Sequence, residues 1–284
     1  MCGSLDAQRK EVKPLLRIDA HCHIYPDAVA ARAVESTGSF YGLPLVYAGT
    51  KSDLLAVHDA AGISHGLIFS VATTPHQGRR INRFIASAAS ESGGRLIGLG
   101  TVHPDSPTLR EDLAEIEALG LRGVKLHPDI QGFKLDDHRC LKIYELCEGR
   151  LPVLVHAGDH RYDYSNPNRL APILSIFTEL TVIAAHFGGW SVWDDALAAL
   201  TEYPNLFVDT SSSLYAMSAE RGRELVRAFG AERVLFATDY PMWDIPTEIA
   251  RFEALGLSEG EKEKIYFRNA AALFGFSPIG SESK

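Results

Sequence analysis

The sequence predicts an α/β fold in which eight parallel strands alternate with helices and close into a (β/α)8 barrel of the TIM type. Short apolar runs rich in β-forming residues alternate with longer amphipathic stretches along most of the chain. The runs are apolar throughout, as in strands that are buried on both faces. The length of 284 residues also suits such a barrel, which needs about 250. An open doubly wound sheet is the alternative, but no GxGxxG motif follows the first run.

Eight runs have the length and composition of strands. Their alternation with helical patterns implies parallel strands joined by right-handed crossovers. The expected strands cover residues 15–21, 66–71, 96–102, 122–127, 152–157, 181–186, 205–210 and 233–239. The expected helices between them cover residues 79–92, 107–119, 137–148, 168–179, 193–203, 219–229 and 246–255.

Two segments depart from the regular strand–helix repeat. The connection 24–65 between the first two strands is longer than a normal crossover, and we expect helices in it near residues 27–34 and 53–61. Long insertions of this kind at the catalytic mouth of a barrel often act as lids. Near the end of the chain, residues 259–274 have helical apolar spacing and predict an added C-terminal helix.

Composition and charge limit the classes of protein that fit. With 46% hydrophobic residues the chain can bury a large core, and its net charge of −8 argues against a nucleic-acid partner. No apolar run approaches the ~18–20 residues that span a bilayer, and the opening segment lacks the apolar region of a signal peptide. The four cysteines form no CxxC motif, which fits a reducing cytoplasm. We therefore expect a cytoplasmic protein with one barrel domain over residues 15–276, a flexible leader over 1–14 and a flexible tail over 277–284.

Polar residues gather at the expected C-terminal ends of the strands, where barrels of this kind place their active sites. Histidine or a carboxylate ends seven of the eight expected strands, and six of the 11 histidines lie at such positions. His103 precedes a proline and fits a strand cap better than a site residue, and Asp209 fits either a supporting carboxylate or a substrate contact. The full set is His21, His23, His103, His127, His156, His186, Asp209 and Asp239.

The spacing of the first histidine pair suits a metal site. Asp19, His21 and His23 alternate along one strand, so their side chains point to the same side. Neutral imidazoles with one carboxylate suit a divalent transition metal such as Zn²⁺, with Mn²⁺ or Fe²⁺ also compatible. An HxH pair alone fits surface or core histidines better than a metal site, so the hypothesis needs distant partners. His156 and Asp239 would complete a set of four ligands.

Five motifs follow one another between residues 18 and 241: IDAHCHIYP, GVKLHP, PVLVHAG, AAHFGG and ATDYP. In this order they resemble the amidohydrolase superfamily, specifically the amidohydrolase-related branch that includes aminocarboxymuconate-semialdehyde decarboxylase. The resemblance implies a distorted (β/α)8 barrel that holds one or two divalent metals, often zinc, at the strand ends. It also implies His21, His23, His156 and Asp239 as the ligands.

The resemblance assigns roles to three further residues. His186 matches the histidine that acts beside the metal as acid, base or electrophile, and Asp19 matches a supporting position deeper in the first strand. Lys125 lies where many superfamily members carry a carboxylated lysine that bridges two metals. In this branch, however, the GVKLHP motif more often accompanies a single metal, so we expect one. Family habit also suggests a homodimer.

Two reactions fit these groups. A bound Zn²⁺ lowers the pKa of water to ~7, Asp239 could move the proton, and His186 could stabilise an oxyanion. These steps describe hydrolysis of a small, acidic amide, lactone or ester. The same groups could instead catalyse non-oxidative decarboxylation of an unsaturated or aromatic acid. The chain is shorter than the well-known decarboxylases of the branch, which favours the hydrolase.

The loop after the fifth strand supplies candidates for binding an acidic small-molecule substrate. The planar fork of Arg161 could hold a carboxylate, with Tyr162 and Tyr164 beside it, although a solvated loop is the alternative. The other expected substrate contacts lie at neighbouring strand ends: Lys125, His127 and Trp190.

Two other classes of protein fit the sequence less well. A structural metal site is usually a closed set of ligands rich in Cys, whereas the candidate ligands here are His and Asp at an open barrel mouth. An oxidoreductase on a doubly wound sheet would need the glycine motif and an acidic ribose partner ~20 residues later, and the sequence has neither.

Overall fold

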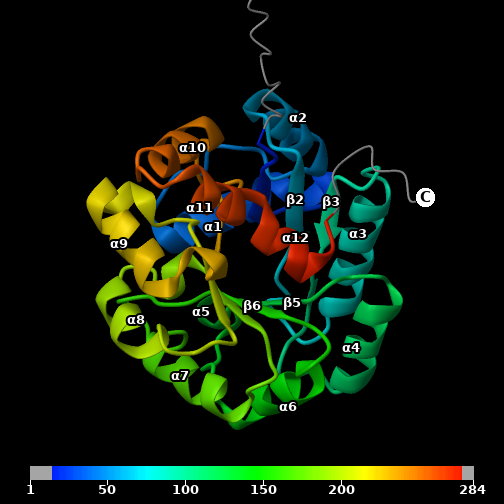
Figure 1. The fold of residues 1–284 in the computed structure, drawn as a ribbon. Coiled ribbons are helices and arrows are strands. Elements are labelled where there is room, and N and C mark those ends of the chain that lie inside the picture. The colour runs from blue at the N-terminus through cyan, green and yellow to red at the C-terminus, as the bar shows by residue number, and fades with distance from the viewer. Residues whose placement is uncertain (1–14, 277–284) are drawn as a thin grey trace, which may run out of the picture.

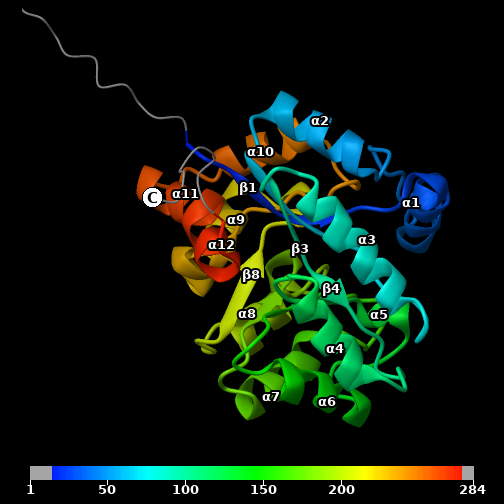
Figure 2. The ribbon, with the colours of Figure 1, turned by 90° about the vertical axis from the view of Figure 1, so that its right-hand side faces the viewer.

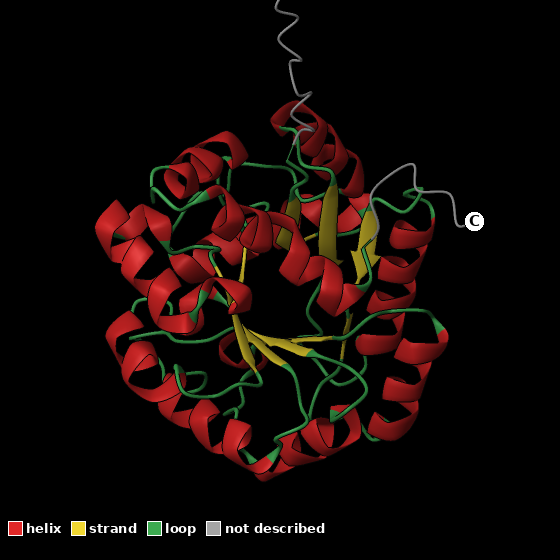
Figure 3. Ribbon diagram, in the orientation of Figure 1, coloured by secondary structure: helices red, strands yellow, loops and turns green. Residues whose placement is uncertain are grey.

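The computed structural model describes residues 15–276, so the predicted leader and tail lie outside the described residues. Parallel strands form a ring and helices surround it (Figures 1 and 3). The strands are β1 (Ile18–His23), β2 (His65–Phe69), β3 (Leu96–Gly98), β4 (Gly100–Thr101), β5 (Val124–Leu126), β6 (Val153–Val155), β7 (Val182–Ala184), β8 (Leu206–Asp209) and β9 (Val234–Leu235).

The strand order follows the chain, with β1–β2–β3 in one set and β4 to β9 in the other. The predicted strand 96–102 is present as two short strands, β3 and β4, which meet at Leu99. The Leu99 amide still donates to the Ile68 carbonyl of β2 at 2.9 Å. On the other side of the ring, the Ala20 amide donates to Phe236 O (2.9 Å) and the His23 amide to Tyr240 O (2.7 Å). The predicted eight-stranded barrel is therefore confirmed.

Most strands are shorter than the apolar runs that predicted them. The run 181–186, for example, yields only Val182–Ala184 as a strand, after which the chain turns into the short helix η1 (His186–Gly188). The residues at the ends of the runs leave the ladder because their backbone groups bond to loops and side chains. The His186 amide, for instance, donates to the Asp209 carboxylate at 3.0 Å.

The outer helices match the expected segments within a few residues. They are α3 (Gly78–Ser90), α4 (Leu109–Ala118), α6 (His138–Cys147), α7 (Pro167–Ile176), α8 (Trp193–Leu200), α9 (Ala219–Phe229) and α10 (Ile245–Glu253). Some short turns were not expected from the pattern. They are α5 (Pro128–Gln131), η1 and the 3-10 turns η2 (Leu214–Ala216) and η3 (Ala231–Arg233).

The first connection holds the two expected helices, α1 (Asp27–Tyr41) and α2 (Lys51–Ala61). α1 is longer than the predicted segment. The prediction ended early because the second half of the helix is rich in Ser, Thr and Gly, which have low helix propensity. Gly38 suits this stretch because the returning chain passes close to it: an added Cβ would lie 2.7 Å from Leu43 O. α1 lies at the opposite end of the barrel from the C-terminal helices (Figure 2).

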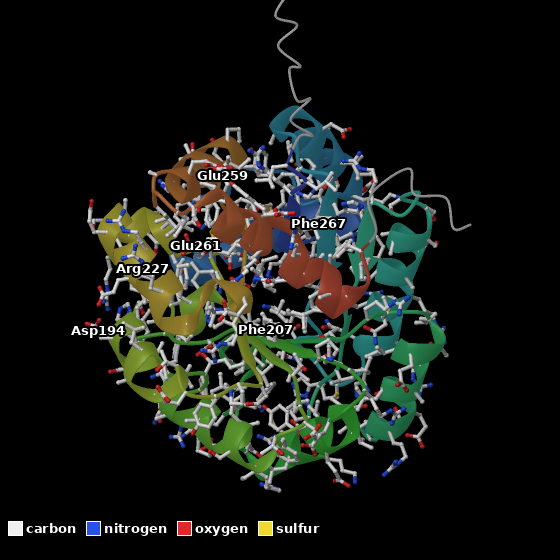
Figure 4. All side chains as sticks on the ribbon, in the orientation of Figure 1. Asp194, Phe207, Arg227, Glu259, Glu261 and Phe267 are labelled. Carbon is white, nitrogen blue, oxygen red and sulfur yellow. The ribbon has the colours of Figure 1, made fainter. Side chains whose placement is uncertain are left out.

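The predicted C-terminal helix is present as α11 (Glu259–Glu263), the π-helical turn η4 (Lys264–Arg268) and α12 (Asn269–Phe274). Ser258 and Glu261 form a capping box at its start. Ala270 and Phe274 close the apolar interior of the barrel from this end, and Phe207 and Phe267 pack against the same cluster (Figure 4). The residues of this interior cluster that lie on the strands or directly beside them are Ile18, Ala20, Leu67, Phe69, Leu99, Leu154, Ile183, Ala185, Leu235 and Ala237.

A second and larger apolar cluster fills the space between the strands and the outer helices. Three cysteines of the described range, Cys22, Cys140 and Cys147, are buried free thiols. Within residues 15–276, no helix combines the length and apolar character required to cross a bilayer. The interior cluster with Ala270 and Phe274 seals one end of the barrel, and the polar residues lie at the other end.

Candidate active site

Three side chains at the C-terminal ends of the first and last strands converge on one point. His21 Nε2 lies 3.2 Å from His23 Nε2 and 3.4 Å from Asp239 Oδ1, and His23 Nε2 lies 3.8 Å from the same oxygen. Two imidazole nitrogens and one carboxylate oxygen are donors that a divalent transition metal accepts. This donor group of His21, His23 and Asp239 therefore fits the metal that the sequence predicts.

Asp209 holds the donor group from behind. His21 Nδ1 donates a hydrogen bond to Asp209 Oδ2 at 2.9 Å, which directs the other ring nitrogen toward His23 and Asp239. The second oxygen of Asp209 accepts from the His186 amide (3.0 Å) and the Ser211 amide (3.1 Å). A carboxylate behind a histidine fixes the tautomer and orientation of the ring. Asp209 is thus a supporting residue, one of the two roles that the sequence left open.

Asp19 supports the opposite edge of the same group. Its carboxylate accepts hydrogen bonds from the Thr238 amide (2.9 Å) and the Thr238 hydroxyl. His58 of α2 lies 3.4 Å from Asp19 Oδ2. Asp19 is fully buried and fixes the residue that precedes Asp239. The insertion α2 therefore reaches the back of the candidate site.

Several site residues have left-handed backbone conformations, which are uncommon for residues other than glycine. His186 and Asp239 both have φ of 61°, and Ser212 has φ of 44°. The Ser212 hydroxyl donates to Asp239 Oδ2 and accepts from Trp243 Nε1 at 2.8 Å. Such strained positions cluster at functional sites, where the surrounding structure enforces them.

A second polar group lies beside the first, at the ends of β5 and β6. The rings of His127 and His156 stack with centroids 4.1 Å apart, and His156 Nε2 lies 3.7 Å from Asp129 Oδ2. His156 Nε2 and Asp129 Oδ1 are buried and have no hydrogen-bond partner. Asp129 Oδ2 accepts from the Ser165 hydroxyl at 2.5 Å.

The predicted fourth ligand, His156, belongs to this second group and lies outside the donor group of His21, His23 and Asp239. Its Nδ1 shares a hydrogen bond of 3.0 Å with Nε2 of His186, which connects the two groups. His186 Nδ1 in turn lies 3.0 Å from Ser211 O. The roles of His156 as ligand and His186 as acid or base stay predictions.

Burial sets the protonation of these groups. It lowers the pKa of His21, His23 and His156 well below the usual range, so their imidazoles are neutral at pH 7 and can bind a metal. Burial also lowers the pKa of His186 to about 4 and raises the pKa of Asp239 to about 7.

Lys125 lies inside the barrel beside the donor group. Its Nζ is 3.3 Å from His21 Nε2, and the side chain is fully buried. Burial lowers the pKa of Lys125 to about 8. A substrate contact at Lys125 would therefore be made beside the donor group, deep inside the barrel, and it stays a prediction.

A cavity of about 570 Å³ opens from the donor group toward the barrel mouth. His21, His23 and Asp239 line its inner end, together with His127, His156 and His186. Residues of α1 and α3 form its outer walls, so the insertion after β1 contributes directly to the site. Tyr41 of α1 lines the cavity, and its hydroxyl lies 2.8 Å from His127 Nε2.

The predicted substrate clamp, Arg161, is occupied by contacts within the protein. Its guanidinium donates to both oxygens of the buried Asp159 and to Phe40 O at 2.8 Å. Tyr162 stacks on Phe40 with centroids 5.8 Å apart and on Tyr164 at 6.1 Å. These contacts fasten the C-terminal end of α1 to the loop after β6. A substrate role for the three residues stays a prediction.

Trp190 lies at the wall of a small recess next to the main cavity, with His156, His186 and Asp239. Its ring packs edge-on against Tyr41 at 5.3 Å, and Nε1 donates to the Tyr215 hydroxyl at 3.3 Å. Trp190 thus lies within the candidate site, and its role as a substrate contact stays a prediction.

The model of one protein family, amidohydrolase, matches residues 18–276. The chain belongs to the amidohydrolase family. The superfamily predicted from the motifs is therefore confirmed, and so is the prediction that the protein is an enzyme. A curated relative, γ-resorcylate decarboxylase of Rhodococcus jostii, is 37% identical over 70 residues, a segment of 25% of this chain and 20% of that enzyme.

Solved structures of similar fold cover nearly the whole chain. An uncharacterized TIM-barrel protein of Bordetella bronchiseptica has a TM-score of 0.76 at 24% identity and covers 92% of this chain and 99% of its own. A Pseudomonas putida protein assigned as 2-pyrone-4,6-dicarboxylic acid hydrolase has 0.66 at 23%, with 93% and 99% covered. A manganese-bound 5-carboxyvanillate decarboxylase of Novosphingobium aromaticivorans has 0.69 at 19%, with 92% and 97% covered. These likenesses confirm the fold.

Sequence reasoning missed several residues of the site. Asp129 follows the GVKLHP motif directly. Because His127 of this motif lies at a strand end, Asp129 could have been included in the predicted site on the same criterion. Tyr41 lies in the insertion, where neither spacing nor a motif marks it. Ser211 and Ser212 belong to the run TSSS directly after Asp209, so the strand-end criterion could have included them.

Proposed function

We propose that this protein is a metal-dependent non-oxidative decarboxylase that acts on a small unsaturated or aromatic carboxylic acid. The donor group of His21, His23 and Asp239, which opens onto the cavity, carries the metal-dependent part of the proposal. The choice of decarboxylation rests on the match to γ-resorcylate decarboxylase. The sequence alone favours hydrolysis, but the named relatives support decarboxylation better.

The proposed cofactor is one divalent transition metal held by His21, His23 and Asp239. His156, which lies outside this donor group, stays the further ligand that the resemblance implies. Zn²⁺ and Mn²⁺ are both compatible with these donors, and the Novosphingobium decarboxylase binds manganese. When bound, such an ion supplies a Lewis acid that neutralises and orients the negative groups of the substrate.

The residues of the chain have two tasks in this reaction. The C–CO₂⁻ bond breaks, its electron pair stays on the substrate carbon, CO₂ leaves, and a proton is added to that carbon. Asp239 and His186 are the groups at the inner end of the cavity that can hold and move this proton. The mainly apolar lining of the cavity would hold the unsaturated or aromatic part of the acid.

The test uses metal-loaded enzyme in ²H₂O with 2,6-dihydroxybenzoate, 5-carboxyvanillate and 2-pyrone-4,6-dicarboxylate as substrates. Decarboxylation releases CO₂ and places one deuteron on the substrate carbon, which NMR detects. Asp239→Asn should abolish both signals, and Asp194→Asn, at an exposed carboxylate far from the donor group, should retain them. Ring opening of the pyrone without CO₂ would replace this proposal by the second candidate, a hydrolase, which the fold likeness to the pyrone hydrolase favours.

A further inference from the structure

Three arginines lie on α3, and only two of them are tied to a neighbouring helix. Arg79 Nε donates to Asp112 of α4 at 2.7 Å, and Arg83 Nε donates to Glu115 of α4 at 2.7 Å. Arg80 points to the other side of α3 and lines the cavity. Within residues 15–276, no hydrogen bond or ion pair connects Arg80 to another side chain or to the backbone.

The cavity walls around Arg80 are apolar. On α3 the lining residues Arg80, Ile81 and Phe84 follow the spacing of one helix face, and Gln77 directly precedes the helix. On α1 the lining residues have the same kind of spacing, with Val29, Ala33, Thr37 and Phe40 among them. The space between the two helices is therefore an apolar slot that leads from the donor group. Arg80 is the single Arg or Lys among its described lining residues.

The size of the cavity exceeds the need of a one-ring acid. A cavity of about 150 Å³ holds one benzene ring, whereas this cavity has a volume of about 570 Å³. Pockets of about 300–1,000 Å³ bind ligands of several rings or comparable length. The exposed guanidinium of Arg80, unpaired beside an apolar wall, suits a carboxylate, which it can bind through two parallel hydrogen bonds.

We propose that the substrate carries two separated acidic groups on an apolar body. One group binds at the donor group of His21, His23 and Asp239, the apolar body fills the slot between α1 and α3, and the second carboxylate pairs with Arg80. This inference rests on the proposed function for the inner group, while Arg80 decides which acids are preferred. Arg161, which the sequence suggests for this task, is already paired with Asp159.

The experiment measures binding of inhibitors to Mn²⁺-loaded enzyme by calorimetry and requires no turnover. The probes are three dicarboxylates of increasing length, namely terephthalate, naphthalene-2,6-dicarboxylate and biphenyl-4,4′-dicarboxylate, each with its monocarboxylate. In the wild type at least one dicarboxylate should bind about 10–100-fold more tightly than its monoacid, as expected for a charge-assisted pair. Arg80→Gln should remove this difference and leave the affinity for the monoacids unchanged.

Arg83→Gln is the matched control, because it removes the same charge from the same helix on the side that faces Glu115. It should keep the preference for the dicarboxylate, and Arg80→Lys should restore part of it. Equal binding of every dicarboxylate and its monoacid by the wild type, or equal loss in both glutamine variants, would overturn the inference. If binding shows the Arg80 preference but no acid loses CO₂, only the decarboxylase proposal fails.

Discussion

The two polar groups at the barrel mouth differ in how completely the protein satisfies them. The first group, called the β1 side below, comprises His21, His23, Asp209 and Asp239. None of its buried side-chain polar atoms lacks a partner. In the β6 side, which comprises His127, Asp129 and His156, two buried polar atoms have none. A buried polar atom without a partner costs about 1–3 kcal/mol, so the two sides contribute differently to the folded state.

This difference indicates a division of tasks. The β1 side is held in position by its own hydrogen bonds, so its donor atoms converge without help from a ligand. The β6 side retains unsatisfied hydrogen-bonding capacity beside the cavity, which favours ligand-dependent contacts.

Asp239→Asn should cause the largest loss, because it removes the carboxylate of the β1 side that is proposed both to bind the metal and to move a proton. Turnover should fall on the order of 10²–10⁴-fold, with an unchanged circular dichroism spectrum. The turnover is measured with an acid that the wild-type protein decarboxylates, and the metal content is measured by elemental analysis. Wild-type turnover in the variant would exclude Asp239 as both ligand and proton carrier.

In the metal-free protein, the buried His186, which shares a hydrogen bond with His156 and connects the two sides, should contribute a loss of stability in acid. The pKa of His186 is about 4 in the folded protein, against about 6.5 in the unfolded chain. Between these values the unfolded chain binds more protons, so the free energy of unfolding decreases as the pH falls from about 6.5 to about 4. For His186 alone the loss approaches about 3 kcal/mol. Urea unfolding at a series of pH values measures it, and His186→Asn should reduce the slope.

Replacing each supporting carboxylate compares the two sides directly. Asp209→Asn should lower metal affinity about 10–100-fold, because His21 loses the partner that orients its ring. Asp129→Asn should lower it less, because Asp129 lies 3.7 Å from His156 Nε2 and forms no short hydrogen bond with it. Titration of metal-free protein with Zn²⁺ or Mn²⁺ gives both values. A larger effect of Asp129→Asn would make the β6 side the principal metal site.

Tyr41→Phe should have the smallest effect. It removes one hydroxyl, 2.8 Å from His127 Nε2, and leaves the ring packed against Trp190. The free energy of unfolding should decrease by about 1 kcal/mol, the usual value of one hydrogen bond, and metal content should stay the same. Thermal and urea unfolding test the first part, and elemental analysis tests the second. A loss of metal would show that α1 contributes to the donor group itself.

The sequence determined the barrel and the strand-end location of the candidate site. Apolar runs such as 152–157 and 181–186 are long enough to identify buried strands, and parallel strands in a ring must present their C-terminal ends on one side. Because side chains alternate along a strand, the HxH spacing alone placed His21 and His23 on the same side. These are local properties, which a single sequence contains.

The tertiary structure decided which of the polar residues meet. Whether His156 turns toward Asp129 or toward His21 depends on the ring stacking with His127 and the hydrogen bond to His186, none of which is near in sequence. Likewise, the position of α1 decided that the Arg161 guanidinium donates to Phe40 O, 121 residues away in the sequence, and that Arg80 lines the cavity. Partners separated by tens of residues are selected by packing, and the pattern of a single sequence does not contain that information.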